Sequence, residues 1–117
     1  MSGNTYYLNL NPIPFELIKA GRKRVEMRLF DERRKVLQVG DYIEFTNNST
    51  GEKLTAKILG LHTFKNFEEL YAHYDKSLLG YSKDEAANPD DMLQYYSKEK
   101  IAQFGTLAIE IELIKKD

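Results

Sequence analysis

Hydrophobic residues recur with a period of two in several stretches, which is typical of strands with one buried face. Residues 5–10, 22–29 and 105–114 alternate in this way, and the alternation is most regular in the last of these stretches. Two more apolar stretches, 42–45 and 53–62, lie on either side of a turn-rich segment of Asn, Ser, Thr and Gly. We therefore expect five or six short strands, two of which form an antiparallel hairpin.

Three short helices are predicted between these strands. The Asn-Pro pair at 11–12 is typical of a helix start. Gly21 is typical of the residue with a left-handed backbone conformation that follows the end of a helix. After a loop over 78–88, Pro89 and Ser97 mark further helical turns. An apolar stripe with a period near 3.6 predicts a helix packed on the core, and it consists of Phe67, Leu70, Tyr71 and Tyr74.

This order of elements indicates an α+β protein built on a small, mostly antiparallel β-barrel or curled sheet flanked by short helices. With 117 residues, of which 42% are hydrophobic, we expect residues 1–117 to form a single domain. The absence of cysteine excludes disulfides and thiolate chemistry. No stretch approaches the ~20 apolar residues of a membrane span, and none resembles a signal peptide. We therefore expect a cytoplasmic protein without a membrane partner.

Charge is almost balanced in total and unevenly distributed along the chain. The 17 basic and 18 acidic residues give a net charge of −1, which argues against a general nucleic-acid coat protein. Residues 19–35 contain eight basic and three acidic residues, whereas residues 65–112 contain five basic and ten acidic residues. An anionic ligand would be steered to the basic end. For the cluster at 31–35, a solvated face without a ligand is the competing interpretation.

The segment 21–28 concentrates the candidate chemistry. A glycine turn leads into a strand that carries Lys23, Glu26 and Arg28. Strict alternation places Lys23 on the face opposite Glu26 and Arg28, so the three converge only through a bulge or in a strand that starts after Lys23. The alternative is an exposed strand whose surface ion pairs are each worth ~0 to 1 kcal/mol.

No pattern indicates a metal ion or a cofactor. His62 and His73 lack the spacing of paired metal ligands, and the chain has no glycine-rich phosphate loop and no Gly-x-Ser-x-Gly nucleophile turn. We therefore expect neither a metal nor a cofactor.

The motif Gly21-x-Lys23-x-x-Glu26-x-Arg28, placed after a short helix, resembles the signature of the ASCH (activating signal cointegrator homology) family. Val39-Gly40-Asp41 before an apolar strand resembles a second landmark of the family, and Phe104-Gly105-Thr106-Leu107-Ala108-Ile109 resembles a third. The resemblance covers most of the chain and implies a PUA-like β-barrel with flanking helices. It also implies a cleft, lined by the Lys, Glu and Arg of the motif, that takes RNA or a nucleotide-like ligand.

These residue types suit such a ligand. Arg28 can pair bidentately with a phosphate or a guanine edge, and Glu26 can accept from an exocyclic amino group. Lys23 adds a compact charge for a phosphate. Tyr81, Tyr95 and Phe104 are candidates for stacking on a base, worth ~1 to 3 kcal/mol, with core packing as the alternative for Tyr95 and Phe104. The expected ligand-binding residues are Gly21, Lys23, Arg24, Glu26, Arg28, Tyr81 and Tyr95.

A small hydrolase acting on acylated cytidine or RNA is the alternative function. The resemblance includes a branch that hydrolyses N4-acylated cytidine with the motif Lys, a Thr and a downstream acid. This chain has Glu26 in place of the Thr, and Asp75 lies roughly where the acid would fall. Lys23 can act as a base only when uncharged, which Glu26 opposes. Glu26 can instead activate a water, with Lys23 and Arg28 as electrostatic stabilisers.

Overall fold

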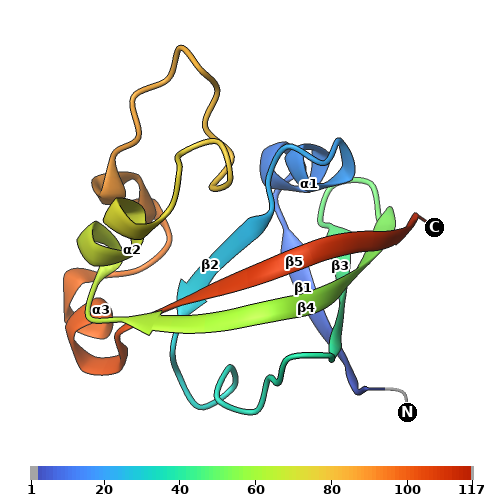
Figure 1. Cartoon of the computed structure of the whole chain (residues 1–117), viewed down its shortest axis with the longest axis horizontal. Coiled ribbons are helices and arrows are strands. Elements are labelled where there is room, and N and C mark those ends of the chain that lie inside the picture. Colours follow the sequence, from blue (N-terminus) through green and yellow to red (C-terminus); the bar gives the residue numbers. More distant parts are fainter. Residues whose placement is uncertain (1–2, 117) are drawn as a thin grey trace.

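The computed structural model of the chain describes residues 3–116, so residues 1–2 and 117 of the expected domain lie outside the described part. Within residues 3–116, five strands, three α-helices and one 3-10 helix follow one another (Figure 1). In order, they are β1 (Thr5–Leu10), α1 (Pro12–Lys19), β2 (Val25–Leu29), β3 (Tyr42–Asn47), β4 (Lys53–Phe64), α2 (Phe67–His73), η1 (Pro89–Gln94), α3 (Lys98–Phe104) and β5 (Thr106–Lys116).

The strands form one curled sheet, a half-barrel, with the order β1-β3-β4-β5-β2. β1 pairs with β3 in parallel, and the other three pairings are antiparallel. The sheet is therefore mixed, whereas the sequence indicated a mostly antiparallel barrel. The parallel pair is possible because α1 and β2 lie between β1 and β3 in the chain and return it to the same end of the sheet. The α+β class and the predicted β3–β4 hairpin are confirmed.

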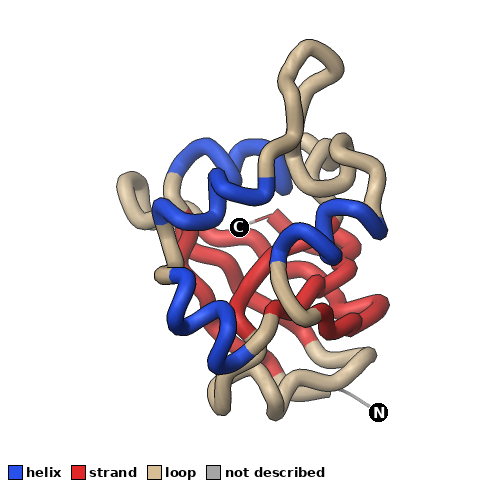
Figure 2. Tube along the Cα trace, turned by 90° about the vertical axis from the view of Figure 1, so that its left-hand side faces the viewer, coloured by secondary structure: helices blue, strands red, loops and turns tan. Residues whose placement is uncertain are grey.

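The sheet separates the buried apolar residues into two clusters. The inner cluster lies within the curl, where α1 contributes Phe15 and Ile18. The outer cluster lies between the other face of β2 and β5 and the layer of α2, η1 and α3, and Figure 2 shows the helices arranged around the curled strands. Because both faces of β5 are covered near its start, residues 106–109 are all buried. The alternation in that stretch had indicated a strand with only one buried face.

The helix ends follow the signals in the sequence. Asn11 precedes α1, and Gly21 has a φ of +77° just after its end. The Asn66 side chain accepts from Glu69 N at 2.9 Å, and Ser97 Oγ accepts from Lys100 N at 3.2 Å, so both cap the helices that follow. The loop between α2 and η1 projects away from the sheet (Figure 1). None of the described helices has the length and hydropathy needed to cross a bilayer.

Candidate functional site

The turn between α1 and β2 brings Lys23 to the side of the strand that carries Glu26. Lys23 N donates to Leu17 O at 3.1 Å and so remains attached to the end of α1. Val25 is the first residue of β2, and its backbone N donates to Leu78 O at 3.0 Å. Strict alternation therefore does not apply to Lys23, because the strand starts after it. Lys23 Nζ lies 3.2 Å from Glu26 Oε1.

The charged side of β2 faces the interior of the curl. Glu26 is opposite Ile109 and Arg28 is opposite Leu107 in the β2–β5 ladder. Residues directly opposite each other share a face of the sheet, and Ile109 and Leu107 belong to the inner cluster. The apolar side of β2, with Val25, Met27 and Leu29, instead packs against the helices. The ion pairs of this strand are consequently not the exposed ones of the alternative interpretation.

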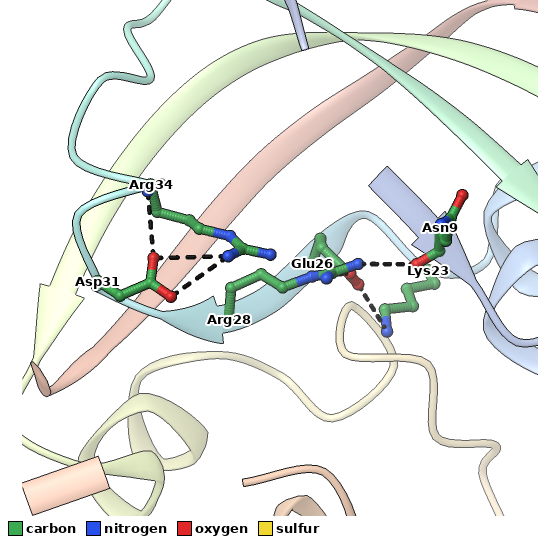
Figure 3. A network of polar contacts seen from close by, with 6 residues as sticks. All are labelled: Asn9, Lys23, Glu26, Arg28, Asp31 and Arg34. Atoms are coloured by element: carbon green, nitrogen blue, oxygen red, sulfur yellow. Dashed lines mark hydrogen bonds and ion pairs between the residues drawn. The ribbon is translucent and has the colours of Figure 1, made fainter. Parts of the chain in front are cut away.

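Glu26 is held between two cations. Its Oε2 lies 2.8 Å from Arg28 Nε, and its other oxygen faces Lys23 Nζ (Figure 3). The exposed fractions of the three side chains are 4% for Glu26, 10% for Lys23 and 14% for Arg28. Arg28 also donates from Nη2 to the backbone oxygen of Asn9 at 3.2 Å. We refer to Lys23, Glu26 and Arg28 as the ion triad.

The electrostatics of the site favour the charged forms of Glu26 and Arg28. Burial opposes ionisation of Glu26, but the positive charges of Lys23 and Arg28 outweigh it and leave the pKa of Glu26 below its ordinary value. Burial likewise disfavours the charged form of Arg28, and the neighbouring Glu26 carboxylate more than compensates, so the pKa of Arg28 is raised. With Lys23 as an ammonium, the triad carries two positive charges against one negative charge.

The triad lines a pocket of about 220 Å³, which we call the triad pocket. The side chain of Tyr95, half of it exposed, forms part of the wall. Tyr96 lies beside it and stacks on Phe67, with ring centroids 6.0 Å apart and an interplanar angle of 13°. The remaining lining comes from β1, the start of α1, β2, the β3–β4 turn and η1, namely Asn9, Leu10, Asn11, Pro14, Met27, Asn48 and Met92. The pocket thus combines charged groups, amides and aromatic faces.

A second cavity, of about 200 Å³, adjoins the triad pocket and contains Tyr81. The two cavities have four lining residues in common, which are Lys23, Met27, Met92 and Tyr95. The Tyr81 hydroxyl lies 2.7 Å from Asp91 Oδ2 and 2.9 Å from the Tyr71 hydroxyl. Burial, together with these contacts, raises the pKa of Tyr81. Tyr81 is therefore next to the ion triad and does not line the triad pocket itself.

Gly80 supports the side chain of Lys23. Its φ of +105° lies in the region that favours glycine, and a Cβ atom there would come within 3.3 Å of Lys23 Cδ. The aliphatic part of Lys23 therefore packs directly on this glycine, and the loop after α2 helps to position the ammonium.

Other residues expected at the site lie elsewhere. Gly21 and Arg24 line a separate, larger cavity of about 500 Å³, which has Lys23 in common with the triad pocket, and Arg24 Nε donates to Gly21 O at 3.3 Å. Asp75 is exposed in a turn, where hydrogen bonds from Ser77 lower its pKa. Phe104 packs against the outer cluster. The structure thus brings Lys23, Glu26, Arg28 and Tyr95 together in the triad pocket, and these other residues do not line it.

Sequence analysis did not identify several residues of the triad pocket. Asn9 and Asn48 come from β1 and from the β3–β4 turn, and nothing in their local sequence marks them as neighbours of β2. Tyr96 falls in the helical turns predicted after Pro89, and nothing in that pattern places it beside Arg28. Gly80, in the adjoining cavity, could have been suspected from the sequence, because an isolated glycine in a loop indicates an unusual backbone conformation.

Within residues 3–116, no three side chains of His, Asp or Glu gather in a way that would hold a metal ion. The rings of His62 and His73 lie 6.1 Å apart, and His62 Nε2 is 3.2 Å from Glu110 Oε2. His62, His73 and Glu110 do not line the triad pocket.

Comparisons with known proteins agree with the motif and the fold. Residues 8–115 match the family model described as the ASCH domain. The crystal structure of the hypothetical protein PH0355 has 31% sequence identity and a TM-score of 0.80, with 94% of this chain and 99% of that chain covered. The solution NMR structure of protein PF0455 from Pyrococcus furiosus has 26% identity and a TM-score of 0.68, with 95% and 98% covered.

A further similar structure is the crystal structure of ASCH from Zymomonas mobilis, with 14% identity and a TM-score of 0.69. The alignment covers 97% of this chain and 72% of that chain, and it supports the fold alone. A comparison with curated proteins gave no match. The family model matches nearly the whole chain, and the chain belongs to the ASCH domain family.

Proposed function

We propose that the chain binds RNA or a nucleotide-like ligand, with a base held in the triad pocket. The ASCH domain family is generally linked to RNA binding. The observation that carries the proposal is that Lys23, Glu26 and Arg28 open into one pocket beside a half-exposed tyrosine. Charged groups that converge in a partly apolar pocket are typical of a ligand site, because burying them without a ligand gives little stability.

The free atoms of the triad fit the edge of a base. Arg28 uses Nε for Glu26 and Nη2 for Asn9 O, which leaves further N–H groups to donate to a carbonyl or a phosphate. Glu26 has lone pairs beyond those facing Lys23 and Arg28, and these can accept from an exocyclic amino group. The exposed face of Tyr95 is suited to stacking on the same base.

The arrangement favours binding over hydrolysis of acylated cytidine or RNA. Each oxygen of Glu26 already faces a cation, and its lowered pKa makes it a weak general base. Asp75, the expected downstream acid, is exposed in its own turn and lines none of the cavities around the triad. We therefore expect no release of cytidine from N4-acetylcytidine and no cleavage of RNA by the purified protein.

The experiment that tests the proposal is a titration of short single-stranded RNA into the wild type and two arginine variants. Arg28→Ala removes a group of the triad, whereas Arg24→Ala removes the same charge from the larger cavity, which shares only Lys23 with the triad pocket. Loss of a bidentate contact costs about 1 to 3 kcal/mol, so Arg28→Ala should weaken binding by roughly 5- to 150-fold. Arg24→Ala should bind as the wild type does, and equal affinities for all three proteins would overturn the proposal.

A second pair of variants covers the case in which Arg28→Ala does not fold. Tyr95 is half exposed, so its replacement should not affect folding. Tyr95→Ala should lose the stacking contribution of ~1 to 3 kcal/mol, and Tyr95→Phe should retain it. Unchanged RNA affinity in Tyr95→Ala would argue against a base in the triad pocket.

A further inference from the structure

We propose that the ligand is a single-stranded nucleic acid that extends beyond the triad pocket, with its next phosphate bound by Arg33 and Arg34. This inference rests on the proposed function and names its substrate class, a chain of at least two nucleotides in place of a free nucleoside. The contacts that support it lie along the seam between β1 and the segment that follows β2.

The seam is the line along which the two edges of the curled sheet approach each other. β1 and β2 are the edge strands, and they form no ladder with one another. Two hydrogen bonds cross the seam instead: Arg28 Nη2 donates to Asn9 O at 3.2 Å, and the Tyr6 hydroxyl donates to Val36 O at 3.3 Å. The triad pocket lies at one part of this seam and a smaller pocket of about 110 Å³ at another.

Arg34 lines the smaller pocket, and part of its guanidinium is unpaired within the described residues. Its Nη1 pairs with the Asp31 carboxylate, at 3.3 Å from Oδ2. Its Nε is buried and has no hydrogen-bond partner within residues 3–116. Figure 3 shows the Arg34 side chain reaching from the segment after β2 toward Arg28. An unsatisfied buried donor costs about 1 to 3 kcal/mol, so the protein satisfies this guanidinium only in part, and an acceptor in the smaller pocket would have to reach Arg34 through its Nη groups.

The charges along the seam favour a phosphate as that acceptor. Lys23, Arg28 and Arg34 provide three positive charges, and Glu26 and Asp31 provide two negative ones. Arg33, which lines the smaller pocket with Arg34, is exposed and forms no ion pair within the described residues. The seam therefore has an excess of positive charge where it leaves the triad pocket.

The opposite direction is unfavourable for a nucleic-acid backbone. The adjoining cavity around Tyr81 is lined by Glu85 and Asp91, and Lys23 is its one cationic lining residue. Carboxylates would repel a phosphate there. The charge pattern thus directs the chain toward Arg34 and away from Tyr81.

The size of the triad pocket also favours an extended ligand. Its 220 Å³ is below the roughly 300 Å³ at which sites for drug-sized ligands begin, so a base fits inside and the rest of a nucleotide lies outside. Tyr7 lies on β1 beside Arg33 and Arg34 and is 69% exposed. Its face is available to the next base, as on other surfaces that bind single strands.

The test compares cytidine 5′-monophosphate with single-stranded RNA of four nucleotides that contains cytidine. We expect the tetranucleotide to bind about fivefold tighter or more, because it adds at least one stacked base. Arg33→Ala should lower the affinity for the tetranucleotide by about three- to tenfold. It should also reduce the slope of log affinity against log salt by about 0.7. Neither Arg33→Ala nor Tyr7→Ala should change the affinity for the mononucleotide. All of these substitutions are at exposed positions, so folding should be retained.

Lys35→Ala is the matched control, since Lys35 lies in the same turn and already pairs with Glu32 at 2.9 Å. It should bind both ligands as the wild type does. Equal affinities for the two ligands, or a tetranucleotide affinity insensitive to both Arg33→Ala and Tyr7→Ala, would overturn this inference. If mononucleotide binding still depended on Arg28, the proposed function would survive that result. If neither ligand bound at all, both proposals would be wrong.

Discussion

Glu26 combines deep burial with a full charge, and its two neighbours make this combination possible. A carboxylate removed from water is costly unless it is paired and hydrogen-bonded, and here Lys23 and Arg28 each take one oxygen. The motif in the sequence identified these three residues, because their types and spacing are local properties. Their burial depends on Asn9, Tyr96 and the helical layer, which come from distant segments and could not be predicted from the motif.

Neutralising Glu26 should destabilise the protein strongly. In Glu26→Gln, two largely buried cations lose their shared counter-charge, and we expect the free energy of unfolding to fall by about 3 kcal/mol. Urea denaturation followed by circular dichroism measures this change. Glu44→Gln is the control, because Glu44 pairs with the half-exposed Lys53 at 3.4 Å and should contribute less than about 1 kcal/mol. Similar losses in the two variants would contradict a special role for the buried pair.

The same carboxylate should make stability depend on pH. The pKa of Glu26 is lower in the folded protein than its ordinary value of 4.5, so the unfolded chain binds this proton at a higher pH than the folded chain does. The stabilisation is therefore fully present above about pH 4.5 and is lost as the pH falls through the folded pKa. When unfolding is measured between about pH 3 and 7, the free energy of unfolding of the wild type should approach that of Glu26→Gln at the acidic end. A constant difference between the two proteins across this range would be inconsistent with the assignment.

At the scale of elements, the site depends on where β2 begins and on the loop that packs against it. The period-two pattern predicted a strand over 22–29, and the structure starts it at Val25, because Lys23 still bonds to the end of α1. Periodicity identifies the faces of a strand and does not locate its first residue. The helix start at Ser97 was predicted, and the cap at Asn66 was not, although each depends only on a side chain and a backbone group three residues apart.

Gly80 allows a test of the loop's contribution. Gly80→Ala and Gly51→Ala both place a side chain at a positive φ, +105° and +77°, and each should lose about 1 to 2 kcal/mol of stability. Gly51 has no atom within 4 Å of the added Cβ, whereas at Gly80 the new atom would come within 3.3 Å of Lys23 Cδ. Only Gly80→Ala should therefore weaken RNA binding in a titration. Equal RNA affinities for the two alanine variants would show that Lys23 does not depend on this contact.

At the scale of the whole molecule, the curl of the sheet creates the site. It brings the edge strands β1 and β2 together at a seam that two side-chain hydrogen bonds cross and that has no strand ladder within the described residues. The α+β class and the curled sheet followed from the order of the elements. The parallel β1–β3 pair did not, because alternation along a strand carries no information about its partner or direction. Tyr81 shows the same limit, since the sequence suggested it only as a candidate for stacking on a base, and the tertiary structure places it in the adjoining cavity.

The central claim is that the triad pocket is where a nucleotide binds, and amide chemical shifts measured by NMR during a titration with cytidine 5′-monophosphate test it most directly. We predict that the largest changes occur at Asn9, Glu26, Arg28 and Tyr95, all of which line this pocket. Residues 111–113, in the separate cavity with Arg24, should not change. Spectra that stay the same throughout the titration, or changes confined to that separate cavity, would contradict the claim.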